Sequence, residues 1–185
     1  MSPALSSGAP LDVDLAAVTA RLGRAPRCRF EVVVRTPAGD PAVIRNDALL
    51  DDGSPMPTRY WLVDPALRRE VDRLESTGGV RAAEAAVDPE ALAAAHRRYA
   101  AERDAALPAG WTGHRPSGGV GGTRRGVKCL HAHLAWYLAG GDDPVGRWTA
   151  FALSEREVEP TPVELTPVEL TPVGLTPVGL GTGRG

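Results

Sequence analysis

The feature that most constrains this chain is a run of four pentapeptide repeats near its end, TPVEL, TPVEL, TPVGL and TPVGL, which begins at Thr161. Proline at every fifth position prevents a continuous helix, because it lacks an N–H group and biases the preceding residue to extended backbone. Solenoid repeats usually have periods of 20 residues or more, so these repeats do not indicate one. The sequence therefore predicts a low-complexity, disordered, polyproline-like tail at residues 157–185 and a single folded domain at residues 11–156.

Composition indicates that the rest of the chain folds around a modest core. The chain has 185 residues, of which 43% are hydrophobic and only 5% aromatic, so its core is expected to consist mainly of Leu, Val and Ala. The net charge of -2 gives no general attraction to nucleic acid or to anionic membranes. The sequence has only two cysteines, no apolar run long enough to span a membrane and no recognisable signal peptide. We therefore expect a cytoplasmic protein without nucleic-acid or membrane partners.

Hydrophobic spacing and turn residues predict an α+β fold. Three β-rich runs, at residues 29–36, 42–50 and 59–63, are expected to form a small antiparallel sheet that is covered on one face. The turn residues PAGDP join the first two runs and predict a hairpin there. About four to five helices should pack with this sheet. Asp64-Pro65 and Asp88-Pro89 each have the form of an N-cap followed by proline at the first helical position. The remaining helices are predicted at residues 12–22, 127–139 and, less regularly, 147–156, and Gly78-Gly79 is expected to stop the helix that follows Asp64.

The Gly-rich stretch at residues 112–126 is the most informative candidate site. Its glycines leave backbone N–H groups exposed, and basic residues surround the expected start of the next helix, where unpaired N–H donors and the helix dipole favour an anion. We expect Gly121 and Gly122 to supply N–H groups. The candidate ligand-binding residues are Gly118, Gly119, Gly121, Gly122, Arg124, Arg125, Lys128, Cys129 and His131. The order of residues matches neither a Walker loop nor a dinucleotide-binding loop, and a flexible loop with ordinary surface arginines is the alternative interpretation.

Cys129, His131 and His133 form a C-x-H-x-H pattern that suggests a metal site or a nucleophilic cysteine. On a helix, however, Cys129 and His133 share a face while His131 points to nearly the opposite side, so we predict no metal site and no cofactor. A thiol in the first turn of a helix near arginines could have a lowered pKa, which keeps a thiol-dependent enzyme open as one alternative.

Two other groups of residues are functional candidates. His96 lies among several arginines, so we expect it on a solvated helix face. Tyr60 and Trp61 could present an aromatic ring to a ligand, but alternate residues of a strand more often pack in the core, which is the interpretation that we favour.

Four segments together resemble a known family: LGRAPR (22–27), DDGSPMPTRYWLVDP (51–65), VDRLESTGG (71–79) and SGGVGGTRRGVKCLHAHLAWYLAGG (117–141). They are similar to an uncharacterised actinobacterial family catalogued as domain of unknown function five hundred and one. The chain matches the family pattern at Pro57, Thr58, Tyr60, Pro65, Gly118, Gly119, Lys128, Cys129, Leu130 and His131. It departs from that pattern at Thr36, His133 and Trp136.

The resemblance implies no activity, because none is established for the family. Family genes often lie near genes for a septum-formation initiator, enolase and an exopolyphosphatase-like enzyme, which implies a phosphorylated ligand or a division-linked partner. Three functions therefore remain open at this point. The protein could bind a small anionic or phosphorylated ligand at the Gly-rich loop. It could instead be a non-enzymatic interaction module, linked to cell division or envelope processes, that recruits a protein partner through the tail. The third alternative is a thiol-dependent enzyme that uses Cys129.

Overall fold

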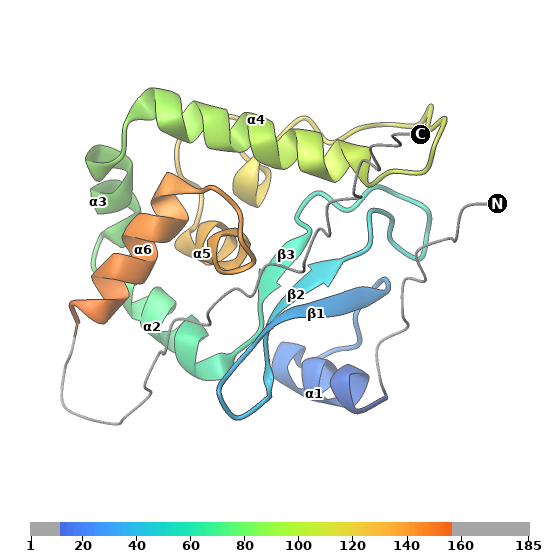
Figure 1. Ribbon diagram of the computed structural model, residues 1–185, viewed down its shortest axis with the longest axis horizontal. Helices are drawn as coiled ribbons and strands as arrows, with labels where there is room; N and C mark the ends of the chain where they lie inside the picture. The colour runs from blue at the N-terminus through green and yellow to red at the C-terminus, as the bar shows by residue number, and fades with distance from the viewer. Residues whose placement is uncertain (1–11, 157–185) are drawn as a thin grey trace, which may run out of the picture.

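The computed structural model describes residues 12–156, and this part of the chain contains three strands, six α-helices and one 3₁₀ helix (Figure 1). In chain order the elements are α1 (Asp12–Leu22), β1 (Phe30–Arg35), β2 (Pro41–Asn46), β3 (Tyr60–Leu62), α2 (Pro65–Ser76), α3 (Gly79–Ala86), α4 (Pro89–Ala105), η1 (Val120–Gly122), α5 (Leu130–Leu138) and α6 (Pro144–Ser154). The predicted α+β class is confirmed. The predicted tail at residues 157–185 lies outside the described residues.

The three strands form one antiparallel sheet in the order β1-β2-β3. In the register, Val32 of β1 is opposite Ile44 of β2, and Val43 of β2 is opposite Leu62 of β3. The turn between β1 and β2 is closed by a hydrogen bond of 2.8 Å from the Thr36 N–H to the Asp40 carbonyl. The hairpin predicted from the PAGDP segment is therefore confirmed.

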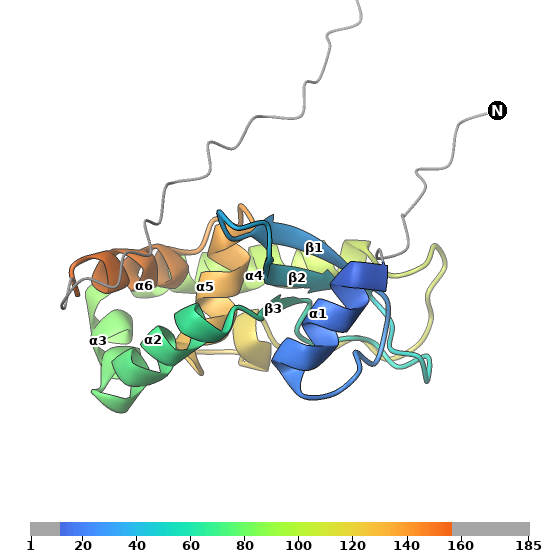
Figure 2. The same ribbon diagram turned by 90° about the horizontal axis from the view of Figure 1, so that it is seen from below.

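The sheet is covered on both faces, so the expectation of a single covered face is wrong. Val43 and Ile44 are neighbours on β2 and point to opposite faces, yet both are fully buried. Ile44 packs with Val18 of α1 and with Phe30 of β1. Val43 belongs to the larger core, which includes Leu134 of α5. Figure 1 shows α4 at the top of the molecule and α1 at its bottom, and in Figure 2, seen from below, α1 lies nearer the viewer than α4.

Aspartate followed by proline starts three of the helices, one more than the sequence analysis found. The side chains of Asp64 and Asp88 each accept a hydrogen bond of 2.8 Å from a backbone N–H in the first turn of α2 and α4, as predicted. Asp143 does the same for α6, accepting bonds from two N–H groups at 2.9 and 3.0 Å. Because of this cap, α6 begins at Pro144 and not near Arg147.

Two helix boundaries differ from the prediction for physical reasons. Gly78 ends α2 with a φ of 89°, as expected, but a further helix, α3, begins at the next residue, Gly79. Helix α5 begins at Leu130, three residues later than predicted, because Cys129 is extended with φ -155° and ψ 146°. Lys128 therefore precedes the helix instead of lying in its first turn.

Tyr60 belongs to the core, as favoured from the strand pattern. It is 6% exposed, and its ring makes an edge-to-face contact with Tyr99 of α4 at 6.3 Å between centroids. Its hydroxyl donates a hydrogen bond of 2.5 Å to Glu102, and burial raises the pKa of Tyr60 to about 12. Trp61 points to the other face of the sheet, where it packs against the cluster formed by Val18, Phe30, Ile44 and Val63.

None of the helices in the described part of the chain is both long enough and apolar enough to cross a bilayer.

Candidate functional site

The start of the Gly-rich segment is held by a buried arginine of α4. Arg103 is only 2% exposed, and its guanidinium donates hydrogen bonds to the carbonyl oxygens of Pro116 and Gly118. It also donates a bond of 2.9 Å to the carboxylate of Asp104. A buried cation is stable only when its donors are paired, so this arrangement fixes the position of residues 116–118 against α4.

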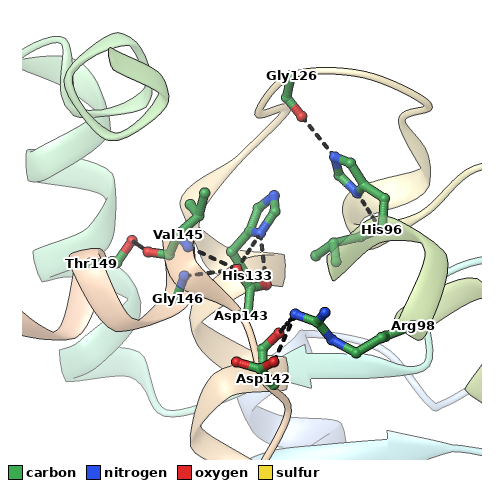
Figure 3. Close-up of polar contacts among 10 residues, drawn as sticks. His96, Arg98, Gly126, His133, Asp142, Asp143, Val145, Gly146 and Thr149 are labelled. Atoms are coloured by element: carbon green, nitrogen blue, oxygen red, sulfur yellow. Dashed lines mark hydrogen bonds and ion pairs between the residues drawn. The ribbon is translucent and has the colours of Figure 1, made fainter. Parts of the chain in front are cut away.

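His96, two turns before Arg103 on the same face of α4, holds the rest of the same segment. Its Nδ1 accepts a hydrogen bond of 3.1 Å from the Val120 N–H, and its Nε2 lies 3.1 Å from the Gly126 carbonyl (Figure 3). These partners require a neutral ring with the proton on Nε2. Burial lowers the pKa of His96, consistent with that form. The expectation that His96 lies on a solvated face is wrong, because it is 6% exposed.

The glycines of the segment allow it to fold tightly on itself and against α4. A Cβ atom at Gly118 would clash with the Gly122 carbonyl oxygen, and one at Gly119 would lie 2.5 Å from the ring of His96. The Gly122 N–H donates to the Gly119 carbonyl at 3.0 Å, and the Gly119 N–H donates to the Thr123 carbonyl at 2.7 Å. These two glycine N–H groups are thus used within the loop. Gly121 lies beside the residues before α5, since a Cβ there would be 3.7 Å from Lys128 Cβ and 3.9 Å from Cys129 Sγ.

The N-terminus of α5 already faces a carboxylate of the protein itself. Glu75, at the end of α2, accepts a hydrogen bond of 2.5 Å from the Leu130 N–H. The same carboxylate lies 3.2 Å from His131 Nδ1, and the other ring nitrogen of His131 lies 3.2 Å from Asp72. The positive end of the helix dipole is therefore complemented by Glu75. An anion added at this helix end would meet that carboxylate.

The two histidines after Cys129 point to different partners, as the helical spacing predicted. His131 faces α2, whereas His133 Nδ1 donates to the carboxylate of Asp143, 2.7 Å away in the loop before α6. Burial raises the pKa of the Cys129 thiol, so less thiolate forms at neutral pH than in free cysteine. Within residues 12–156, no three His, Cys, Asp or Glu side chains are placed to hold a metal ion.

The pair formed by His133 and Asp143 is a buried feature that the sequence analysis missed. Both side chains are fully buried, and Asp143 also caps α6 (Figure 3). Nε2 of His133 has no hydrogen-bond partner among the described residues. The rings of His133 and His96 meet edge to face, with centroids 5.7 Å apart. The pair thus ties the start of α6 to α5, directly behind the histidine that holds the Gly-rich segment.

An open pocket of about 340 Å³ lies between α3, the start of α4 and the second half of the Gly-rich segment. Its lining residues are Glu84, Pro89, Leu92, Ala93, His96, Arg124, Arg125 and Gly126. Arg124 donates two hydrogen bonds to Ser117 Oγ, at 2.7 and 3.1 Å. The guanidinium of Arg125 has no ion-pair or hydrogen-bond partner among residues 12–156. The pocket therefore joins an apolar wall to two exposed cations.

The predicted site residues thus fall into separate places. Arg124 and Arg125 line the pocket, whereas Gly118 and Gly119 are buried beneath it. Gly121, Lys128 and Cys129 gather beside the start of α5.

The residues that hold the segment could have been found from periodicity. Leu92, His96, Tyr99 and Arg103 recur at helical spacing, which places all of them on one face of α4. Asp143 carried the same Asp-Pro signal as the two predicted caps. No comparable signal pointed to Glu84, because no capping side chain marks the start of α3, the helix that carries it.

Comparison with known proteins provides one match. A family model described as "Protein of unknown function (DUF501)" matches residues 32–150. No curated protein and no solved structure matches the chain significantly.

Proposed function

The chain belongs to the DUF501 family, whose description assigns no activity, and from the geometry of the pocket we propose that it binds a small anionic or phosphorylated ligand. The observation that carries this proposal is that Arg124 and Arg125 both line the wall of one pocket. Guanidinium groups recognise phosphate and carboxylate oxygens through two parallel hydrogen bonds, which gives direction as well as charge. The binding site is thus the pocket beside α4.

The anchored segment supports this assignment. Arg103 and His96 hold the backbone on both sides of Thr123, so the two arginines project from a loop whose position is already fixed. A loop that is ordered before binding loses less conformational entropy when the ligand arrives. The geometry therefore supports binding of the ligand at this loop.

Lys128 distinguishes a ligand site in the pocket from a ligand site at the N-terminus of α5. It is exposed, has no ion-pair partner in the described part of the chain, and does not line the pocket. A Cβ atom at Gly121 would lie 3.7 Å from Lys128 Cβ, which places Lys128 on the side of the segment that faces α5. A ligand in the pocket depends on Arg125, whereas a ligand at the helix end depends on Lys128.

A thermal-unfolding screen at fixed ionic strength tests the proposal, with phosphate, sulfate and nucleotides compared against chloride. A ligand at 100 times its dissociation constant stabilises by about 2.7 kcal/mol, which corresponds to a melting shift of about 5–11 °C for a chain of this size. We expect Arg125→Ala to abolish the shift and Lys128→Ala, which removes the same charge, to retain most of it. The absence of a shift with every anion would contradict the proposed function, and loss of the shift only in Lys128→Ala would move the site to α5.

A further inference from the structure

The pocket that carries the two arginines also carries one carboxylate. Glu84 comes from α3 and reaches the loop backbone, because a Cβ atom at Gly126 would lie 2.5 Å from Glu84 Oε1. Gly126 follows Arg125 directly in the chain and has a φ of 63°. The carboxylate therefore lies against the same short stretch of backbone that presents the arginines.

The opposite charges in the pocket do not form ion pairs with one another. No salt bridge within 4.0 Å joins Glu84 to Arg124 or Arg125, and within residues 12–156 neither Glu84 nor the Arg125 guanidinium has another ion-pair partner. Arg124 is directed to Ser117 instead. Both signs of charge are thus available to a molecule that enters the pocket.

The wall between these charges is apolar. Pro89, Leu92 and Ala93 of α4 contribute hydrocarbon surface. His96 also contributes to the wall, but both of its ring nitrogens are already bound to the loop backbone. Most of the hydrogen-bonding capacity of the pocket therefore resides in its two arginines and in Glu84. A ligand that matches this surface has two polar ends and a short hydrocarbon between them.

We propose that the ligand is a small zwitterion: a phosphate or carboxylate group binds Arg124 and Arg125, a short apolar linker lies on α4, and an ammonium group binds Glu84. This inference rests on the proposed function, since it specifies the chemistry of the ligand in the same pocket. It predicts discrimination that binding of an anion alone would not give, because a ligand without the ammonium group leaves Glu84 beside an apolar end.

Two isosteric probes test the inference by calorimetric titration of the full chain. Phosphoethanolamine and propyl phosphate differ in having an ammonium or a methyl group at the end of the same linker. We expect the protein to bind phosphoethanolamine about three- to fivefold more tightly, which is the effect of a solvent-exposed ion pair. Glu84→Gln should abolish this preference. Glu90→Gln, an equal change of charge on an exposed residue of α4 outside the pocket, should retain it.

The outcomes separate the inference from the proposed function. Equal affinities for the two probes, both lost in Arg125→Ala, would overturn the zwitterion and leave anion binding intact. A preference for phosphoethanolamine that survives in Glu84→Gln would overturn the role of Glu84. If neither probe nor inorganic phosphate binds, the proposed function itself fails.

Discussion

The two halves of the Gly-rich segment differ in how they are held. Residues 116–120 are bound by buried side chains of α4, with Arg103 on two carbonyl groups and His96 on the Val120 N–H. Residues 124–128, which end the segment and lead to α5, are bound by a buried side chain of α4 only at the Gly126 carbonyl, 3.1 Å from His96 Nε2. They carry three cations, none of which forms an ion pair with another described residue. The difference indicates that the first half determines the position of the loop and the second half presents charge to a ligand. Substitutions in the first group should change stability, and those in the second should change binding.

The largest effect is expected at Arg103. Arg103→Met keeps much of the side-chain volume but leaves the carbonyl groups of Pro116 and Gly118 without their buried donor. We expect the free energy of unfolding to fall by about 3 kcal/mol, measured by urea denaturation. Arg97→Met on the exposed face of the same helix is the matched control and should change it by less than about 0.5 kcal/mol. Similar small effects in both variants would show that the first half of the segment is not anchored by α4.

A smaller loss is expected at Asp143, which extends the comparison to two adjacent aspartates. Asp143→Ala removes the cap of α6 and the partner of His133, and should lower the free energy of unfolding by about 2 kcal/mol. Asp142→Ala is the control, because its ion pair with Arg98 is exposed and contributes at most about 1 kcal/mol. Equal costs in the two variants would contradict the structural role given to the buried pair.

His96 should make stability depend on pH. Burial lowers its pKa in the folded state, so below about pH 6.5 the unfolded chain binds more protons at this position than the folded chain does. The contribution of His96 is therefore complete above the unfolded-state pKa and is lost as the pH falls toward the lowered pKa, with a slope of up to about 1.4 kcal/mol per pH unit. Urea titrations between pH 7.5 and 5 measure this slope. His96→Gln should remove it, whereas replacement of the exposed His114 by Gln should not; an unchanged slope in His96→Gln would assign it to other groups.

Much of the fold could be predicted from local signals. The Asp-Pro pairs gave the starts of α2 and α4, because a capping carboxylate and a fixed proline φ act within one turn of the chain. The hairpin followed from alternation and turn residues. Helix α3 was missed because it begins at Gly79, where no side chain caps it, and it is maintained instead by packing against neighbouring helices. The start of α5 was also misplaced, because it is set by Glu75, a contact between residues 55 positions apart.

The site was predicted in part, for a related reason. Arg124 and Arg125 were found from composition, since arginines after a run of glycines are visible in the sequence. His96 was assigned to a solvated face because several arginines lie near it in the sequence, although its spacing from Leu92 places it, like Arg103, on the buried face of α4. Glu84 could not be associated with the loop, because its proximity to Gly126 depends on how α3 packs, which no local pattern specifies.

The most direct test of the central claim locates the bound anion on the native chain. A titration of ¹⁵N-labelled protein with phosphoethanolamine, followed by amide chemical shifts, reports which backbone groups lie near the ligand. We predict the largest changes at Ala93, Arg125 and Gly126, which line the pocket, and smaller changes at Leu130, whose N–H is already bound to Glu75. Changes that are largest at Leu130 and His131, with none at Gly126, would contradict it and return the site to the start of α5.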